Sequence, residues 1–384
     1  MANSFGNIVP VLIAQGLQTL RAACTMPRLV NSDYSNDPAN QGDTVNLWIP
    51  SAATVSDVSP SAAPATPDDS APVRAAIPLS RWRKSGFHLT DKQRMEIISG
   101  FPSKQAQECV KVIAEDINAY ILSKAKAIYG FAGVSGTTPF ATNVSEATAA
   151  RKVLNNQLAP LSDRRLVMNA DAEANALGLA VLTTMQNIGD AQGIKEGQIG
   201  RRLGFDWYMD QQVPTLTSTP LTAGACTVNG VNAVGAGTTD GGRTGTISIA
   251  KATNASPLVA GDIITIAGDA QTYVVREDVS LAVGNTTVKI APALKKATAG
   301  GEAITLKATH AMNLAFHRDC FGFVSRPLAA SNANTIESMS VPDPVSGITL
   351  RLEVIRQNKQ DYYEFDVLYG AECVRPELGV RIAG

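Results

Sequence analysis

The chain has 384 residues, of which 45% are hydrophobic and 17% charged, and its formal net charge is −1. This length predicts two or three packed units. The charged fraction is below the ~25% of ordinary soluble proteins, which leaves neutral surface that other subunits can cover. An Ala- and Thr-rich soluble protein is the alternative explanation of this composition. The net charge near zero and the lack of a basic tail exclude a dedicated nucleic-acid-binding protein.

The N-terminal segment, residues 6–24, is predicted to form an amphipathic helix, and Pro10 stands near its start, where proline is tolerated. It has neither the basic region nor the A-x-A cleavage site of a signal peptide. No apolar run reaches the ~18 residues that span a bilayer. We therefore expect a protein that is made in a cytoplasm and contacts no membrane. The apolar residues expected on one side of the helix are Ile8, Val11, Leu12, Leu17 and Leu20.

A polar, proline-rich stretch lies between two strand-like segments. In the first segment, Thr44–Ile49, apolar and polar residues alternate, and a second segment follows at Arg74–Leu89. Residues 51–73 between them are rich in Ala, Ser and Pro and have too few large apolar side chains to fold alone. Strand, loop and strand predict an extended two-stranded arm. A flexible linker between domains is the alternative.

Residues 103–129 give the clearest helical pattern, with Ser103 as a candidate N-cap and glycines from Gly130 onward ending it. At ~1.5 Å per residue this helix spans roughly 40 Å, which suits the spine of an elongated domain. Lys111 and Lys124 lie off the apolar stripe, so we expect both to tolerate substitution. The stripe consists of Cys109, Val110, Val112, Ile113, Ile117, Tyr120, Ile121 and Ile128.

An α/β region follows the spine helix. Helices are predicted at 145–158 and 170–188, around a short buried strand at Arg165–Asn169. Residues 189–204 are Gly-rich and polar, typical of a loop, and the aromatic segment Phe205–Thr215 is strand-like.

Residues 219–309 differ in composition, because Gly, Thr, Ala and Val dominate and the helical period disappears. Short strands separated by turns predict a small β-barrel or sandwich. Residues 311–324 and 347–374 return to a mixed α/β pattern, so the β-unit is expected to be an insertion. Its predicted strands are Thr244–Ile249, Asp262–Ile266, Tyr273–Arg276, Thr287–Ile290 and Ala303–Leu306.

The sequence contains no set of residues typical of a catalytic, cofactor-binding or metal site. There is no G-x-S-x-G motif and no P-loop, and the five cysteines are far apart, as expected of reduced, buried thiols. His310 and His317 are seven residues apart and, with Asp319, are a weak candidate for two ligands on one helical face. We therefore expect no cofactor and no enzymatic activity.

The order of these parts resembles that of tailed-phage coat proteins, and more specifically the family of the phage P22 coat protein. The most specific segment is Leu203–Thr215, LGFDWYMDQQVPT, directly before the insertion, where that family keeps a similar segment. The likeness in layout covers nearly the whole chain, although the close motifs are short. The other similar segments are Asn46–Pro50, Leu368–Ala371, Val374–Glu377 and Gly379–Val380.

The resemblance implies an α+β, HK97-like capsid fold with an inserted all-β barrel or Ig-like domain. It also implies a major capsid protein of the virion that self-assembles as pentamers and hexamers into an icosahedral shell around double-stranded DNA, in the cytoplasm of a host bacterium. Implied partners are a separate scaffolding protein, a portal protein, a decoration protein and weakly held DNA. The implied parts are an N-terminal arm (1–35), an E-loop region (36–92), a spine helix with the P domain (93–144), an A/P α/β region (145–218), the insertion (219–309) and a return to the A and P domains (310–384).

Charged residues of the arm are the candidate contacts between subunits. Asp68 and Asp69 lie at its expected tip, and Arg81, Arg83 and Lys84 at its base. Solvated surface is the alternative for both groups. Because Lys84 is the first lysine of the chain, we expect no isopeptide cross-links from the arm. A carbohydrate-binding or adhesive module built on the insertion is the alternative function, and it would require an exposed aromatic platform.

Overall fold

The computed structural model describes residues 8–33, 44–50, 55, 57, 72–96, 101–183, 197, 199–221, 226–238, 240, 242–252, 256–328 and 335–383. The chain divides into two compact units. The first unit comprises Met1–Val45, Ile77–Thr217 and Thr309–Gly384, and the second comprises Asn46–Ala76 and Ser218–Ala308. In the described part of the chain, no helix has the length and apolar character needed to cross a membrane.

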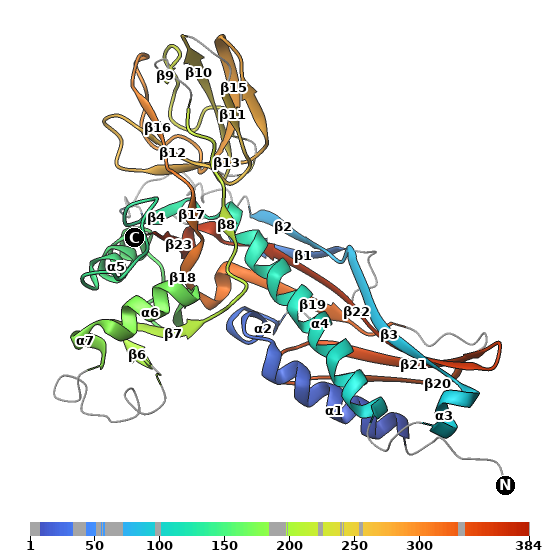
Figure 1. Ribbon diagram of the computed structural model, residues 1–384. Coiled ribbons are helices and arrows are strands. Elements are labelled where there is room, and N and C mark those ends of the chain that lie inside the picture. The colour runs from blue at the N-terminus through green and yellow to red at the C-terminus, as the bar shows by residue number, and fades with distance from the viewer. Residues whose placement is uncertain are drawn as a thin grey trace. The chain divides into compact units, whose positions relative to one another are not determined.

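Two helices of the first unit, α1 (Ile8–Ala23) and α4 (Phe101–Ser123), lie side by side (Figure 1). Gly16 permits their close approach, because a Cβ at this position would lie 3.2 Å from a methyl group of Val110. The α1 helix was predicted correctly, but Val11 was placed on the wrong side, since it is 55% exposed. Among the described residues of α1, the buried apolar side chains are Leu12, Ile13 and Leu20.

The spine helix α4 is shorter than predicted. It ends at Ser123, and the chain tightens into a 3-10 turn, η3 (Lys124–Ala127), whose end is closed by the N–H of Ile128 donating to the carbonyl of Ala125. Gly130 does not stop the helix but begins strand β4 (Gly130–Ala132). The helix has 23 residues, about 35 Å. Because α4 ends at Ser123, the residues from Gly130 onward can pair in a sheet. The helical pattern of the sequence did not predict this strand.

The five-stranded sheet of the first unit is built around the long strand β22 (Gln360–Cys373). β3 (Arg81–Thr90) pairs with one edge of β22, and β21 (Thr349–Gln357) and β19 (Phe321–Arg326) follow one another along the other edge. β20 (Thr335–Pro342) pairs with β21. Helices α1 and α4 pack against the strands of this sheet and bury the largest apolar core (Figure 1).

A second sheet of the first unit has six strands, in the order β4-β23-β18-β5-β7-β6. β23 is parallel to β4, and β5 is parallel to β7, whereas the other pairs are antiparallel. Helix α5 (Ser145–Asn156) packs on β4, β18 and β23. The strand bounds are β5 Arg164–Met168, β6 Arg201–Arg202, β7 Phe205–Met209, β18 Asn313–His317 and β23 Gly379–Ile382.

Two further predictions for this unit were wrong. The helix expected at 170–188 is divided at Leu179, whose extended backbone separates α6 (Ala170–Gly178) from α7 (Ala180–Thr183), and residues 184–188 lie outside the described part. The mixed α/β pattern at 311–324 and 347–374 forms strands: a 3-10 turn joins β18 to β19, and a two-residue turn at Asn358 and Lys359 joins β21 to β22. The remaining short elements of the unit are α2 Met26–Leu29, α3 Asp91–Glu96, β8 Thr215–Leu216, β17 His310–Ala311, η4 Arg318–Cys320 and η5 Pro376–Leu378.

The predicted arm contains the two-stranded sheet of β1 (Thr44–Ile49) and β2 (Val73–Pro78). Arg74 Nε donates to Asn46 Oδ1 at 2.7 Å between them. The segment predicted as one strand, 74–89, is two strands, because β2 ends at Pro78 and β3 begins at Arg81. Most of the intervening loop, including Asp68 and Asp69, lies outside the described residues.

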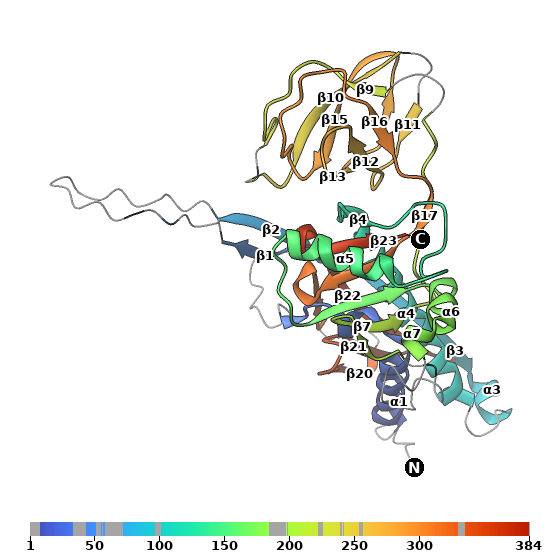
Figure 2. The same cartoon turned by 90° about the vertical axis from the view of Figure 1, so that its left-hand side faces the viewer.

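The insertion forms a barrel in the second unit. Six strands pair in the order β16-β12-β13-β15-β10-β9, several of which are visible side by side in Figure 2. The first and last strands of this order are joined by a bridge between Thr227 and Ala303 and by the Val228 N–H, which donates to the Glu302 carbonyl at 2.9 Å. The strands are β9 Cys226–Val228, β10 Gly245–Lys251, β11 Ser256–Leu258, β12 Ile263–Ile266, β13 Thr272–Val275, β14 Val279–Leu281, β15 Gly284–Ala291 and β16 Ile304–Leu306.

We expect residues 218–309 to fold when they are expressed alone. The barrel has its own apolar core, which is separate from that of the first unit. Ser218 should be included, because its hydroxyl donates to the buried carboxylate of Asp262 at 2.6 Å. A dispersed amide NMR spectrum is the expected result. A narrow spectrum, typical of a disordered chain, would show that the barrel depends on the rest of the protein.

Candidate functional site

The basic residues predicted at the base of the arm lie on β3, where it pairs with β22. Arg81 and Arg83 reach the same carboxylate of the spine helix, Asp116, with N···O distances of 3.5 and 3.4 Å. The Tyr369 hydroxyl of β22 donates to that carboxylate as well. Burial, followed by this hydrogen bond, raises the pKa of Tyr369. Asp116 therefore links α4 to both strands.

The aromatic ring of Tyr120, one turn after Asp116, is contacted by two cations. The Arg81 guanidinium carbon lies 4.3 Å from the ring centroid, and the Lys124 ammonium lies 5.0 Å from it. The Tyr369 ring meets Tyr120 edge-on, with centroids 5.6 Å apart. Cation–π contacts of this kind add modest stability that grows as water is excluded. We call Arg81, Arg83, Asp116, Tyr120 and Tyr369 the spine cluster.

The even-numbered residues of β3 have partners of their own on β22. Trp82 Nε1 donates to Asp366 Oδ2 at 2.8 Å, and Lys84 Nζ lies 3.0 Å from Glu364 Oε1. Asp366 is also bound by Arg351 of β21, whose Nε and Nη2 donate to its two oxygens at 2.8 and 2.5 Å. Both charged side chains of this pair are less than 10% exposed.

The predicted basic group is therefore divided between two faces of the sheet, because successive side chains of a strand point to opposite faces. Arg81 and Arg83 contact the spine helix, although the Arg83 side chain is still 53% exposed. Lys84, which is 66% exposed, and Trp82, which is 63% exposed, lie on the other face of the strand. Sequence reasoning did not single out Trp82, although a tryptophan between basic residues on a polar strand was a usable signal. A role for Arg81, Arg83 and Lys84 between subunits stays a prediction.

Lys124 makes a partly buried contact that its position off the apolar stripe did not predict. Its ammonium pairs with Glu372 Oε2 at 2.8 Å, and only 24% of the side chain is exposed. Burial lowers the pKa of Lys124, but Glu372, through its hydrogen bond and charge, and Tyr120 together outweigh this, so that the pKa is raised. Lys124 is therefore charged at neutral pH.

We expect Lys124→Gln to lower the free energy of unfolding by about 1 kcal/mol, the scale of a partly buried charged hydrogen bond. Lys111→Gln is the control, because Lys111 lies 3.9 Å from Glu115 and is 51% exposed. It should change the free energy of unfolding by less than about 0.5 kcal/mol. Urea unfolding of unassembled subunits measures both, and equal effects would contradict the special placement of Lys124.

The histidines do not form the predicted pair on a helical face, because His310 and His317 lie on strands β17 and β18. The His310 ring meets Phe131 edge-on, with centroids 5.2 Å apart. The buried His317 accepts the N–H of Asp319 at Nδ1, at 3.3 Å. Among the residues that the structure describes, no three His, Cys, Asp or Glu side chains are grouped so as to hold a metal ion.

We expect protonation of His317 to lower the free energy of unfolding as the pH falls below about 6.5, the ordinary histidine pKa. Burial lowers the pKa of His317, and Arg164 and Arg165 act in the same direction, against the opposing charges of Asp319 and Asp163. Below the unfolded-state pKa the unfolded chain takes up the proton first, so the free energy of unfolding falls until the folded-state pKa is passed, by at most about 1.4 kcal/mol per pH unit.

The measurement for His317 is urea unfolding at pH 7.5 and pH 5 of the parent and of His317→Gln. The variant should lose less stability than the parent between these two pH values. The exposed His88, whose ring stacks on Tyr362 at 5.6 Å, provides the control variant His88→Gln, which leaves the surroundings of His317 unchanged. An identical pH dependence of the parent and His317→Gln would refute the assignment.

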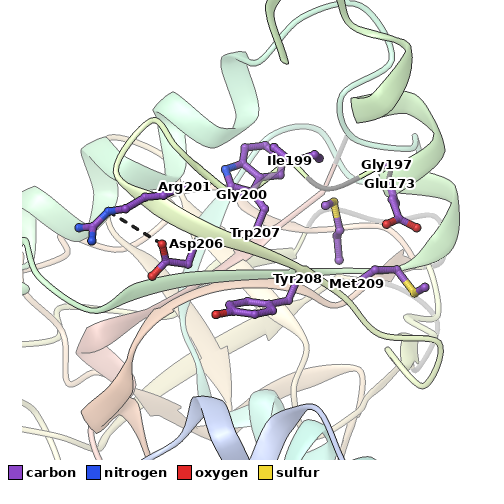
Figure 3. Close-up of a pocket in the computed structure, with 10 residues that line it drawn as sticks. Glu173, Gly197, Ile199, Gly200, Arg201, Asp206, Trp207, Tyr208 and Met209 are labelled. Carbon is purple, nitrogen blue, oxygen red and sulfur yellow. Dashed lines mark ion pairs between the residues drawn. The ribbon is translucent and has the colours of Figure 1, made fainter. Parts of the chain in front are cut away.

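A pocket of about 460 Å³ lies beside β7 and the preceding loop (Figure 3). Its apolar wall includes Trp207, and Arg201 pairs with Asp206 at 3.9 Å on one side. Glu173 lies at the other side, away from Asp206 (Figure 3), so the two carboxylates do not form an acid–base pair. The pocket can accommodate a side chain or a short segment, but its described lining offers no nucleophile with an adjacent base.

The insertion does not present the aromatic platform that a carbohydrate-binding module would need. Its one aromatic residue, Tyr273, is fully buried. The hydroxyl donates to Asp269 at 2.6 Å and accepts the N–H of Lys295 at 3.1 Å. The ring therefore belongs to the barrel core.

No protein-family model matches the sequence, and no curated protein matches it. Solved structures do match. A structure from Mycobacterium phage Che8 is 15% identical, with a TM-score of 0.51 over 93% of this chain and 90% of that chain. The capsid structure of cyanophage P-SCSP1u is 11% identical, with a TM-score of 0.51 over 94% of this chain and 88% of that chain. The predicted fold class, an α+β HK97-like capsid fold with an inserted β-domain, is thereby confirmed.

Proposed function

We propose that this chain is a major capsid protein, which self-assembles into a closed phage shell. The observation that carries the proposal is the fold shared with the cyanophage capsid structure over 94% of this chain, at a TM-score of 0.51. A likeness that extends across both units is more informative than one confined to a single widespread domain, because folds alone host many functions.

The described surface supports an assembly role more than a catalytic one. Trp82 and Lys84 offer an apolar and a charged group beside one another on an exposed strand. β3 has a partner strand, β22, and no second strand pairs with it in the described part of the chain. Such an edge is suited to contact with another chain. Many weak contacts of this kind, repeated around a closed shell, give a stable assembly.

We further propose the finer assignment that the sequence resemblance implies. In it the subunits form pentamers and hexamers of an icosahedral virion around double-stranded DNA, in the manner of the P22 coat-protein family. A scaffolding protein, a portal protein and a decoration protein are the proposed partners, DNA contact is weak and nonspecific, and assembly takes place in the host bacterial cytoplasm. The segment Leu203–Thr215 before the barrel supports this assignment.

Electron microscopy of the purified chain, expressed alone and together with a candidate scaffolding protein, tests the proposal. Closed shells, sheets or tubes built from this chain are the expected result. The isolated barrel, residues 218–309, expressed in the same way should stay monomeric, which distinguishes assembly from contaminating particles. A folded chain that sediments as a monomer under all conditions, including high concentration and added scaffolding protein, would contradict the proposed function.

A further inference from the structure

Two buried cysteines of the first unit face each other. Cys320 ends the turn η4, and Cys373 is the last residue of β22. Their sulfur atoms are 3.9 Å apart. Cys320 is 0% exposed and Cys373 is 7% exposed. Phe321 lies opposite Cys373 in the pairing of β19 with β22, so the Cys320 thiol, just before β19, lies beside the end of β22.

The surroundings leave room for the Cys320 sulfur. At the neighbouring Gly379, a Cβ would lie 3.0 Å from Cys320 Sγ and 2.7 Å from Ile128 Cδ1. Any larger residue would therefore crowd the sulfur. A disulfide bond needs Cβ atoms about 3.8 Å apart and a sulfur–sulfur distance of about 2.0 Å. The two sulfur atoms, 3.9 Å apart, must therefore approach one another by side-chain rotation before the bond can form.

We propose that Cys320 and Cys373 are a modification site, at which a peroxide forms a disulfide bond that joins the start of β19 to the end of β22. The Cys373 sulfur attacks one oxygen of hydrogen peroxide, which breaks the O–O bond and gives a sulfenic acid and one water. The Cys320 sulfur then attacks the Cys373 sulfur and expels hydroxide, which takes the Cys320 proton and leaves as a second water. Two thiols are oxidised and one peroxide is reduced.

The burial of the pair decides the order of these steps. Cys373 is slightly exposed, so peroxide reacts with it first, whereas Cys320 is inaccessible to solvent. Burial and then the hydrogen bond with Cys373 raise the pKa of Cys320 well above its ordinary value, so Cys320 is protonated at neutral pH and reacts slowly with external oxidants. It is nevertheless placed against the Cys373 sulfur, where it can intercept the sulfenic acid before further oxidation.

The bond would close a long loop between the two residues, which restricts the unfolded chain and raises the melting temperature. The three other cysteines, Cys24, Cys109 and Cys226, are buried elsewhere, and Cys24 Sγ lies 3.8 Å from the carbonyl of Ala114. The inference concerns one chain and does not depend on the proposed shell.

The experiment treats the full-length, unassembled protein with hydrogen peroxide, alkylates remaining thiols in denaturant, and maps peptides by mass spectrometry. We expect one peptide pair, containing Cys320 and Cys373, to lose two hydrogen atoms. We also expect a higher melting temperature that reverts on reduction. Cys24→Ser is the matched control and should give the same bond, whereas Cys373→Ser should give none.

Peptide mapping of the parent decides the question even if a cysteine variant fails to fold. The proposal is overturned if Cys373 is oxidised to sulfinic acid while Cys320 keeps its thiol, if the disulfide joins other cysteines, or if all five thiols survive peroxide that oxidises a free cysteine peptide. A bond between Cys320 and Cys373 that lowers the melting temperature would refute the stabilising role.

Discussion

We expect the substitution Ile117→Asp to lower the free energy of unfolding of the subunit by about 4 kcal/mol. Ile117 is fully buried on the spine helix, between Ile113 and Ile121 on the same stripe, which are at most 2% exposed. A carboxylate at this position must either stay ionised in apolar surroundings or take up a proton, and both states are costly. The packing of α4 against α1 and the long sheet would be lost locally.

Urea unfolding of unassembled subunits, followed by tryptophan fluorescence, measures this effect. Trp82 and Trp207 lie in the first unit and report on its unfolding, whereas Trp48 lies in the second unit. Lys111→Gln, on the exposed side of the same helix, is the control and should leave the midpoint nearly unchanged. An unchanged midpoint for Ile117→Asp would contradict the burial of this face of α4.

Asp366→Asn is expected to cost about 3 kcal/mol, because it removes one partner of a buried ion pair and leaves the other charge without full compensation. Arg351 binds both oxygens of Asp366, and the two side chains are 8% and 7% exposed. Glu353, whose Oε1 lies 3.0 Å from Arg351 Nη1, offsets part of the loss. The indole of Trp82 also loses its carboxylate acceptor.

The matched control for Asp366→Asn is Glu364→Gln, two residues earlier on the same strand. Glu364 pairs with Lys84, which is 66% exposed, and exposed pairs contribute only about 0–1 kcal/mol. The same urea titration compares the two variants. A loss as small for Asp366→Asn as for Glu364→Gln would mean that the buried pair contributes no more than a surface one.

Regular periodicity in the sequence correctly predicted the elements whose burial follows one face. The helix pattern found α1 and most of α4, and alternating residues found β1 and most strands of the barrel, because a helix or strand with one apolar side repeats at its own period. Gly-rich turns at the barrel strands signalled a separate β-unit. The family resemblance, carried chiefly by Leu203–Thr215, extended these elements to a fold class.

Local patterns did not predict the end of a helix where the following residues pair with a distant strand. They also did not distinguish helix from strand where the apolar residues fit both periods. The helix pattern continues past Ser123, but the chain turns there because residues from Gly130 onward pair with β23. The segment 347–374 carries apolar residues at both periods. Pairing with β20, β3 and β19 decides in favour of two strands, β21 and β22.

The periodic elements, the separate barrel and the basic character of residues 81–84 could be predicted from the residues alone. What those residues contact depends on how the chain packs. The tertiary structure placed Arg81 and Arg83 on Asp116, directed Lys84 to Glu364, and brought Cys320 to Cys373 across 53 positions of the chain. The physical reason is that the period of a segment fixes which of its side chains share a face, whereas the partners on that face come from distant segments whose register is set by packing.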